Sequence, residues 1–555
     1  MLSILKNPVK NPLIVVLSGL LLFAAWPMSP LTFLIFIAWV PLLIIEARST
    51  RPYRFFFILL LNFLIWNTAT TWWIWNASEG GALGAIIANS ILMTIPWMLF
   101  RITKQKLGSS IGYTSLVLYW ITYEYIHHNW DLSWPWLTLG NVFANYPEWI
   151  KWYQYTGTTG GSFWVLIVNV LVFNSYFLQK TNAEVISFQT FSNPQNPLKL
   201  SLPRLLRGFR QYGVIAAIII LPVVCSLYMG IEKKSITLLP INNNNIVVIQ
   251  PNIDPYEEKF SAPVSLQIEK LIKLSESQID SNTRMVVWPE TAVPTQVWEN
   301  QITTNEYYQP IFAFAKRHPI IMLVTGIDSY VNHGSNNPGG FSIRKNKDGN
   351  FYYEAFNTAM AIDNNGLPQI YHKSKLVPGV ESLPSWLAFL GKMFEDYGGI
   401  SGTLGTSEEP MVFSSPNNMY KPAPVICYES IYGEYVTEYV RKGANVIIII
   451  TNDGWWGNTP GYKQHQSYAR LRAIETGCWV VRSANTGISC FISPEGIVYQ
   501  PQPWAKEAAI KMNIPPIEHK TFYVQHGDWI SRIVWVLAAI VLLWTMVVSL
   551  INKKQ

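Results

Sequence analysis

The chain has 555 residues, of which 50% are hydrophobic and only 14% are charged, so a single soluble domain is excluded and part of the chain is expected to lie in lipid. The net charge of +7 does not indicate nucleic-acid binding, because the basic excess lies in the apolar part: residues 1–230 carry 14 basic and 6 acidic residues, whereas residues 231–528 carry 24 and 28. We therefore expect a membrane protein without a nucleic-acid partner.

Apolar runs near the length that crosses a bilayer recur along the first part of the chain and again at its end. They lie at residues 12–28, 31–46, 55–75, 82–100, 112–127, 161–179, 212–230 and 529–551. The first run does not resemble a cleaved signal peptide, because a second run follows it after almost no loop. We predict a membrane domain at residues 1–230 with seven transmembrane helices, and an eighth helix with a cytoplasmic tail at residues 529–555.

The cations between these runs indicate the orientation in the membrane. Arginine and lysine residues fill alternate connections at residues 48–54, 101–106 and 180–210, whereas the intervening connections hold only Lys151. By the positive-inside rule this pattern places the N-terminus in the cytoplasm and residues 231–528 on the outer side. A catalytic domain there has no access to cytosolic ATP or NADH, so we expect chemistry driven by its substrates alone, without a cofactor.

An aromatic-rich connection at residues 128–160 lies on the same outer side. Its rings include Trp130, Trp134, Trp136, Trp149 and Trp152. The simpler interpretation is an aromatic belt at the membrane surface. The alternative is that these rings also line an entry path for lipid.

From residue 246 the pattern changes to short β-branched runs that alternate with polar helical segments. Strands are expected at residues 246–250, 285–288, 320–326, 357–362, 424–427, 444–451, 479–482 and 488–492, and helices at 262–281, 304–317, 431–442 and 461–477. Residues 330–351 resemble an elaborated surface hairpin. This alternation predicts an α/β domain of packed layers at residues 231–528.

Three polar side chains in this domain form a set that suits acyl transfer. Glu290 follows the expected strand 285–288, and Cys427 lies where the strand 424–427 ends. A lone glutamate in such a place is more often solvated or a capping residue. Together with Lys373, however, Glu290 can take the proton of the thiol, and the lysine can stabilise both the thiolate and a tetrahedral oxyanion.

Spacing leaves some choices open. Lys375 lies two residues after Lys373 and would point the same way on a strand, so the sequence pattern does not select one lysine. Cys478 and Cys490 lie in apolar or helical surroundings and are interpreted as core residues. Cys225 falls inside an apolar run, and the four cysteines lack metal-ligand spacing, so neither a metal site nor a disulfide framework is expected.

Several motifs resemble those of the carbon-nitrogen hydrolase (nitrilase) superfamily. They are Trp288-Pro-Glu-Thr-Ala-Val-Pro294, Tyr371-His-Lys373 with Leu376-Val-Pro378 and Glu381, Ile426-Cys-Tyr-Glu429, Thr451-Asn-Asp-Gly-Trp-Trp-Gly457, Gln464-His465, Arg470 to Glu475 and Arg482-Ser-Ala-Asn-Thr-Gly487. Their combination with a multi-span membrane part, which includes Pro135-Trp-Leu137 and Gly140, is similar to the apolipoprotein N-acyltransferase family of that superfamily.

The resemblance implies a nitrilase-like αββα sandwich for residues 231–528 and a role for each site residue. The implied catalytic residues are Glu290, Lys373 and Cys427, and the implied supporting residues are Glu381, Tyr428 and Glu429. Substrate-binding candidates are Phe260 and, beside the expected site, Trp455 and Trp456, for which ordinary packing is the alternative. Lys373 is selected over Lys375 because the lysine of the family precedes a second glutamate by eight residues. This chain departs from the family pattern at two places. It has Gly379-Val-Glu381 where the family has Phe-Gly-Glu, and Phe260 where the family has a tryptophan.

The resemblance further implies a reaction. Cys427 would take an acyl chain from a membrane phospholipid as a thioester and pass it to the α-amine of the N-terminal S-diacylglyceryl-cysteine of a bacterial lipoprotein. We expect a monomer in the inner membrane with its catalytic domain on the periplasmic side. Two alternatives are a membrane-tethered amidase or nitrilase, in which water replaces the amine, and a non-enzymatic lipoprotein-binding or transport protein. The scarcity of ionisable residues within the apolar runs disfavours transport.

Overall fold

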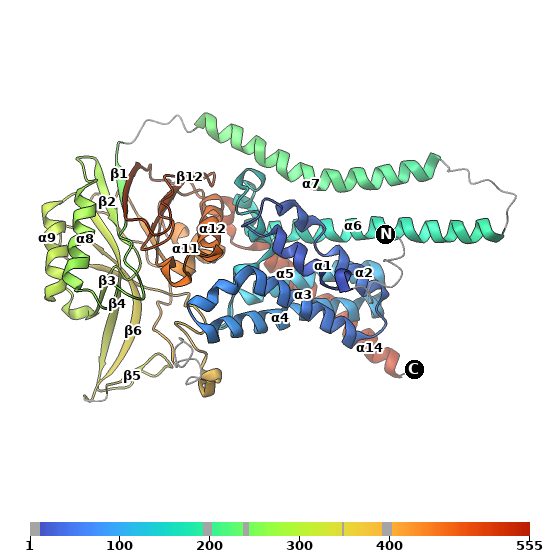
Figure 1. Ribbon diagram of the computed structural model, residues 1–555, viewed down its shortest axis with the longest axis horizontal. Coiled ribbons are helices and arrows are strands. Elements are labelled where there is room, and N and C mark those ends of the chain that lie inside the picture. Colours follow the sequence, from blue (N-terminus) through green and yellow to red (C-terminus); the bar gives the residue numbers. More distant parts are fainter. Residues whose placement is uncertain (1–11, 193–201, 237–242, 347–348, 391–401, 555) are drawn as a thin grey trace.

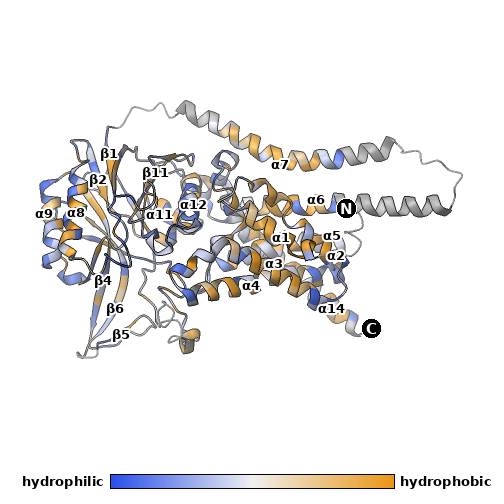
Figure 2. Ribbon diagram, viewed as in Figure 1, coloured by the Kyte–Doolittle hydropathy of each residue, from blue (hydrophilic) through white to orange (hydrophobic). Residues whose placement is uncertain are grey.

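The computed structural model describes residues 12–192, 202–236, 243–346, 349–390 and 402–554. Two β-sheets with flanking helices form one end of the molecule, and a bundle of helices forms the other (Figure 1). Hydrophobic residues dominate the helices of the bundle (Figure 2). The predicted division into a helical, apolar region and an α/β region is therefore confirmed.

Five helical segments among the described residues are long and apolar enough to cross a membrane. They are Pro52–Asn76, Glu79–Leu107, Tyr153–Ser175, Arg210–Gly230 and Trp529–Asn552. The helices that carry them are α3 (Pro52–Thr71), α4 (Glu79–Leu107), α6 (Tyr153–Ser192), α7 (Leu202–Ile236) and α14 (Trp529–Lys554). These helices indicate a multi-pass membrane protein.

The remaining expected spans are shorter or broken helices. The first is α1 (Pro12–Ala25) and the fifth is α5 (Ser109–His127), but residues 31–46 do not form one helix. They form a 3-10 helix at Thr32–Phe36 and part of α2 (Val40–Arg48), which has Pro41 in its first turn. Because proline favours a helix start and cannot sit in a helix interior without breaking a hydrogen bond, the expectation of one continuous helix there is wrong. The count of eight spans stays a prediction.

Two sheets form the centre of the α/β region. The first has the order β13-β1-β2-β4-β6-β5, with β3 paired to β4 and β7 to β6, and the second has the order β12-β11-β10-β9-β8. The strands are β1 (Asn245–Gln250), β2 (Thr283–Val287), β3 (Val293–Trp298), β4 (Met322–Gly334), β5 (Arg344–Lys345), β6 (Tyr352–Ile362), β7 (Gln369–His372), β8 (Pro422–Ile426), β9 (Val446–Thr451), β10 (Val480–Ala484), β11 (Cys490–Ile492), β12 (Val498–Tyr499) and β13 (Ala508–Asn513). Strands β1, β2 and β4 run parallel, as do β8, β9 and β10.

Alternate side chains of each central strand enter two different cores. In β1, Val247 and Ile249 pack with helices α8 (Val264–Glu276) and α9 (Gln309–Arg317), whereas Ile246 and Val248 pack against the second sheet. Helices α11 (Gly433–Arg441) and α12 (Pro460–Thr476) cover the other face of that second sheet (Figure 1). Because both faces of each sheet are buried, the strands are continuous apolar runs. The predicted αββα layering is confirmed.

Every expected strand and helix of this region is present, with its ends moved by at most five residues, except that β4 runs eight residues past its expected end. The expected hairpin at residues 330–351 is the antiparallel pair β4–β6 with β5 at its edge. Strands β3, β7, β12 and β13 were not expected. β13 completes the sheet through its antiparallel pairing with β1 over residues 508–513, so the last strand of the domain lies beside its first strand.

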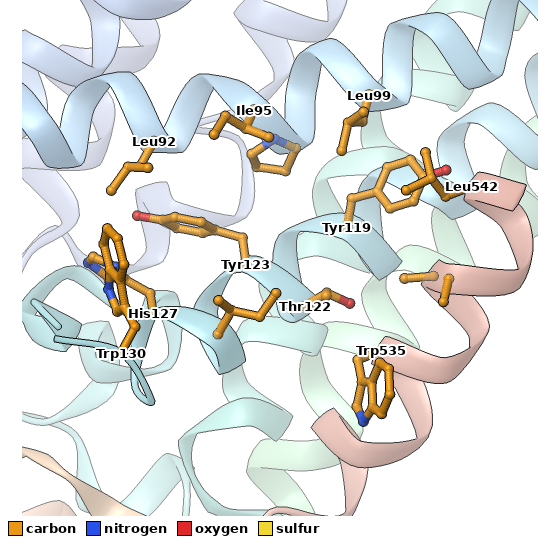
Figure 3. Close-up of a pocket in the computed structure, with 14 residues that line it drawn as sticks. Leu92, Ile95, Leu99, Tyr119, Thr122, Tyr123, His127, Trp130, Trp535 and Leu542 are labelled. Carbon is orange, nitrogen blue, oxygen red and sulfur yellow. The ribbon is translucent and has the colours of Figure 1, made fainter. Parts of the chain in front are cut away.

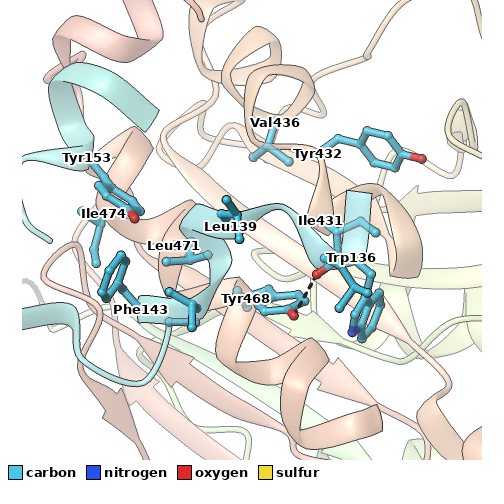
Figure 4. Close-up of a cluster of buried hydrophobic side chains, with 14 of the residues drawn as sticks. Trp136, Leu139, Phe143, Tyr153, Ile431, Tyr432, Val436, Tyr468, Leu471 and Ile474 are labelled. Atoms are coloured by element: carbon cyan, nitrogen blue, oxygen red, sulfur yellow. Dashed lines mark hydrogen bonds between the residues drawn. The ribbon is translucent and has the colours of Figure 1, made fainter. Parts of the chain in front are cut away.

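Two rings of the aromatic connection at residues 128–160 are buried between the two regions. Trp136 and Leu139 are fully buried against α12, where the hydroxyl of Tyr468 donates a hydrogen bond of 3.0 Å to the Trp136 carbonyl oxygen (Figure 4). Trp134 is also buried, and its ring stacks on that of Tyr428 with centroids 5.8 Å apart. The belt interpretation is therefore wrong for Trp134 and Trp136, because other parts of the protein cover both rings.

Gly140 lies within this contact, where the backbone of α6 comes too close for a side chain. A Cβ atom on Gly140 would lie 1.9 Å from the carbonyl oxygen of Thr158. Gly140→Ala is therefore expected to lower the free energy of unfolding by about 1–3 kcal/mol, because the two segments must separate. Thermal unfolding of the detergent-solubilised protein measures this loss. Gly84→Ala is the matched control, since a Cβ atom on Gly84 of α4 meets nothing within 4 Å, and an equal loss in both variants would contradict the prediction.

Candidate active site

The structure brings the three expected catalytic residues together at strand ends. Glu290 lies beyond the end of β2, Lys373 directly follows β7, and Cys427 directly follows β8. Cys427 begins a 3-10 turn (Cys427–Ile431) and has a φ of 48°. Such a left-handed conformation is unfavourable for a residue with a side chain, and it occurs where the surrounding structure fixes a functional geometry. The turn presents the thiol at the end of the strand, where it is 8% exposed.

Two carboxylates hold the ammonium group of Lys373, and one amide bridges those carboxylates. Its Nζ atom lies 2.8 Å from Oε1 of Glu381 and 3.4 Å from Oε1 of Glu290. The side-chain amide of Asn357, in β6, donates to the same two oxygens at 2.9 and 2.8 Å. The backbone N–H of Asn452 donates to Oε2 of Glu290 at 3.0 Å. These bonds fix the glutamate that is expected to act as the base.

Asn357 was not expected in the site. Its strand was predicted from the run at residues 357–362, and the available signal was a single amide in a buried run that is apolar apart from Thr358. Buried amides require hydrogen-bond partners. The sequence pattern does not say that those partners are Glu290 and Glu381.

Burial and charge set the protonation states of the site. Burial raises the pKa of the Cys427 thiol, and the charge of Glu290 raises it further, while Lys373 and a hydrogen bond with Thr451 oppose them. Burial alone would lower the pKa of Lys373, but Glu381 and Glu290 outweigh it and raise that pKa. The resting site therefore holds a neutral thiol beside an ammonium group. A thiol in this state requires a base before it can attack, and Glu290 is the carboxylate beside it.

Glu429 links the segment that carries Lys373 to the strand that ends at Cys427. Its Oε1 atom accepts hydrogen bonds from the Tyr371 hydroxyl at 2.6 Å and from the backbone N–H of Ser374 at 2.7 Å. Its Oε2 atom accepts from the backbone N–H of Ile426 at 2.8 Å. Glu429 is fully buried and forms hydrogen bonds with both segments, and its supporting role stays a prediction.

The pKa of Glu429 predicts a specific dependence of stability on pH. Burial raises this pKa to about 7, whereas a carboxyl group in the unfolded chain titrates near about 4.3. Between these values the folded protein binds more protons than the unfolded chain, so stability falls as pH rises through this window. In Glu429→Gln this fall is expected to be smaller. The thermal midpoint measured from pH 4.5 to 8 for both proteins tests this, and parallel curves would contradict it.

A second buried network supports the backbone at Cys427. Nδ1 of His465 lies 2.9 Å from Oδ1 of Asp453, and Arg482 contacts the other carboxylate oxygen, Oδ2, at 2.7 Å. Nε2 of His465 lies 2.9 Å from the Ser430 hydroxyl, which donates to the Cys427 carbonyl oxygen at 2.7 Å. The order serine, histidine, aspartate resembles a nucleophilic triad. Because Ser430 is fully buried, it does not meet a substrate, and the network holds the turn instead.

The other candidate residues lie around this centre. Lys375 is not a strand neighbour of Lys373, because β7 ends at His372. The Nζ atom of Lys375 lies over the rings of Tyr432 and Tyr435, 5.5 and 5.3 Å from their centroids. Cys478 and Cys490 are buried, and burial raises their pKa values to about 12 and about 11.

The three substrate-binding candidates differ in exposure. Trp456 is partly buried, with its ring 4.7 Å from that of Trp73 and 5.8 Å from that of Trp136, which favours packing. Trp455 is half-buried, and Phe260 is 66% exposed. Their contact with a substrate stays a prediction.

Comparison with known proteins assigns both regions. The family model "Carbon-nitrogen hydrolase" matches residues 247–516, and the model "Apolipoprotein N-acyltransferase N-terminal domain" matches residues 18–171. The chain is 28% identical to an apolipoprotein N-acyltransferase of Chlorobaculum tepidum over 543 residues, which cover 96% of this chain and 95% of that protein. It is 31% identical to one of Allorhizobium ampelinum over 284 residues, 50% of this chain and 47% of that protein.

Among solved structures, an amidase from Nesterenkonia sp. matches 54% of this chain and 98% of its own, with 15% identity and a TM-score of 0.35. Both family models match this one chain, and the relative from Chlorobaculum tepidum aligns with it over nearly the full length of both. The chain therefore belongs to the apolipoprotein N-acyltransferase family.

Proposed function

We propose that this protein transfers an acyl chain from a membrane phospholipid to the α-amine of the N-terminal S-diacylglyceryl-cysteine of bacterial lipoproteins. The observation that carries the proposal is the buried set around Cys427, in which Lys373 bridges Glu290 and Glu381. A base, a fixed cation and a thiol on a strand-end turn are the groups that covalent acyl transfer requires.

In the first half-reaction, Glu290 removes the proton of the Cys427 thiol as the sulfur attacks an ester carbonyl of the phospholipid. The ammonium group of Lys373 stabilises the negative charge that develops on the carbonyl oxygen. The ester C–O bond then breaks, and Glu290 returns the proton to the leaving alkoxide. The products are a lysophospholipid and a thioester at Cys427.

In the second half-reaction, the neutral α-amine of the lipoprotein attacks the thioester carbonyl. Glu290 takes a proton from the attacking nitrogen and returns one to the departing sulfur of Cys427. An amide forms and the free thiol is restored, so atoms and charges balance without a cofactor. Because both substrates use one site in turn, ping-pong kinetics are expected.

The two regions have complementary roles in this proposal. Residues 1–230 and 529–555 form the membrane part, and residues 231–528 form the catalytic domain on the periplasmic side of the inner membrane. Moving an acyl chain into water costs about 0.8 kcal/mol per CH₂, so a site at the bilayer surface avoids that cost. Phe260 and Trp455 are the exposed and half-exposed rings that suit its mouth.

The test supplies purified protein with a phospholipid labelled in its acyl chain and a synthetic diacylated lipopeptide that has a free α-amine. The labelled amide of the lipopeptide is the expected product. Cys225→Ala is the matched control for Cys427→Ala, because Cys225 is an exposed thiol on α7 remote from the site. Release of labelled free fatty acid without any amide would overturn the proposal in favour of a hydrolase.

A further inference from the structure

Two cavities in the described part of the chain do not include the catalytic cysteine. One is an apolar groove of about 350 Å³ between α4, α5 and α14, with Leu92, Tyr123 and Trp535 in its walls (Figure 3). The other is a polar pocket of about 220 Å³ whose lining includes Lys375. Cys427 lines neither of them, so neither brings a polar group to its sulfur atom. The polar neighbours of the sulfur lie instead at the strand ends.

Thr451 lies beside Cys427 because their strands pair in register. Strands β8 and β9 run parallel with Ile426 opposite Ile450, so the next residue of each chain segment, Cys427 and Thr451, lie side by side at the end of the pair. The Thr451 hydroxyl forms a hydrogen bond with the Cys427 thiol. Thr451 is fully buried, and its backbone carbonyl oxygen accepts a hydrogen bond of 3.0 Å from the N–H of Asn485. Because χ1 of a β-branched side chain is restricted, the hydroxyl oxygen has a fixed place and only its hydrogen turns.

The single proton of this hydroxyl has two acceptors within reach. Beside the neutral thiol it is donated to Oδ1 of Asp453, at 3.0 Å, so the Thr451 oxygen can only accept from the thiol. Once Glu290 has taken the thiol proton, the sulfur is an anion and becomes the second acceptor. A hydroxyl that turns toward it forms a charge-assisted hydrogen bond, which is stronger than a neutral one.

Asp453 keeps other partners when the hydroxyl turns away. Nδ1 of His465 lies 2.9 Å from its Oδ1 atom, and Arg482 contacts its Oδ2 atom at 2.7 Å. All three side chains are fully buried. Since the carboxylate is never left without a partner, the turn of the hydroxyl does not create an unsatisfied buried charge.

The charges around the sulfur explain why it needs a donor of its own. The charged groups that face the thiol are Glu290, Lys373 and Asp453, and the two carboxylates disfavour a thiolate. The ammonium group of Lys373 is shared between Glu381 and Glu290, at 2.8 and 3.4 Å. In the proposed reaction this group stabilises the carbonyl oxygen of the substrate. A neutral donor at the sulfur therefore supplies a stabilisation that Lys373 does not.

We propose that Thr451 is a further catalytic residue, whose hydroxyl turns from Asp453 to the Cys427 sulfur whenever that sulfur carries negative charge. This role rests on the proposed acyl transfer for its place in the reaction. In the first half-reaction the hydrogen bond forms as Glu290 takes the thiol proton, and it is released in the thioester, because an uncharged sulfur is a weak acceptor. In the second half-reaction it forms again on the departing sulfur. The proton stays on the Thr451 oxygen throughout, and only the direction of the O–H bond changes.

The first test measures the reactivity of the thiolate and needs no acyl transfer. Full-length protein that carries Cys225→Ala is alkylated with iodoacetamide in mild detergent from pH 6 to 9, and peptide mapping reads the modification at Cys427. Thr451→Val keeps the shape of the side chain without its hydroxyl. We expect this variant to react about three- to tenfold more slowly at each pH. The thiolate fraction falls about 10- to 100-fold, and the greater nucleophilicity of a more basic thiolate restores about half of that loss on a logarithmic scale.

Two further variants separate the hydroxyl from general stability. Thr451→Ser restores the hydroxyl and should restore the alkylation rate. Thr437→Val is the matched control, because Thr437 is also fully buried and donates one hydroxyl hydrogen bond, of 2.6 Å, to the carbonyl oxygen of Glu434 in α11. If thermal unfolding shows that Thr451→Val does not fold, Thr451→Ala takes its place with the same expectation. An unchanged alkylation rate without the hydroxyl, or an equal loss in Thr437→Val, would overturn the proposal.

A second arm places Thr451 in the reaction. In the transfer assay Thr451→Val should lower kcat by about tenfold or more and leave both KM values near those of the parent, since the hydroxyl contacts the sulfur and neither substrate. Raised KM values with an unchanged kcat would contradict a catalytic role. A parent protein that forms no amide would refute the proposed acyl transfer, whereas the alkylation rates would still decide whether Thr451 stabilises the thiolate.

Discussion

Cys427→Ala is expected to lower the rate of acyl transfer by roughly 10⁴-fold or more, the loss typical of removing a catalytic nucleophile. The thiol lies on a strained turn beside Glu290 and Lys373, and alanine leaves that turn with no atom that can hold the acyl chain. Initial rates of amide formation with a labelled phospholipid and a diacylated lipopeptide measure the effect.

Controls separate chemistry from folding in this experiment. The thermal midpoint of Cys427→Ala should stay near that of the parent protein, because the change removes one sulfur atom from a site that is 8% exposed. Cys225→Ala should keep full activity. Residual activity of Cys427→Ala within tenfold of the parent rate would exclude a thioester at this residue.

Lys373→Met is expected to destabilise the protein by about 3–5 kcal/mol and to abolish transfer. Methionine nearly fills the space of the lysine, but it leaves the carboxylates of Glu290 and Glu381 buried without their shared cation. Removing one partner from a buried ionic network is costly because the remaining charge is neither hydrated nor paired. The loss also removes the positive charge that stabilises the oxyanion.

The matched control is Lys442→Met. Lys442 also pairs with a carboxylate, Glu409, at 2.6 Å, but both side chains are exposed to solvent. Exposed pairs contribute little to stability because solvent screens their charges, so this variant should keep its stability and activity. Thermal unfolding and transfer assays compare the two variants, and similar losses in both would show that burial at Lys373 is not the cause.

The α/β fold could be predicted because its strands are buried on both faces. Val247 and Ile249 face one core while Ile246 and Val248 face another, so the strand is an uninterrupted β-branched run. Such runs are visible in the sequence, and so are the polar residues that follow them, such as Glu290. Short strands such as β7, with four residues, lack this signal. For that reason the expectation that Lys375 lies on the same strand as Lys373 was wrong.

Long-range contacts could not be read from local patterns. The amide of Asn357 reaches two glutamates from distant parts of the chain, and Glu290 comes within its reach because β4 pairs with both β2 and β6 in one sheet. Likewise, Trp136 lies in an aromatic-rich segment typical of a membrane surface, but it is buried because α12 packs against it. Pairing and docking depend on the whole fold.

The central claim is that Cys427 carries the acyl chain between the two substrates. The most direct measurement is the intact mass of the purified protein after incubation with phospholipid alone, followed by addition of the diacylated lipopeptide. The account predicts an increase equal to one acyl group, located at Cys427 by peptide mapping, which disappears when the lipopeptide amine is added. A protein that transfers the chain but never gains this mass, or gains it at another residue, would contradict the account.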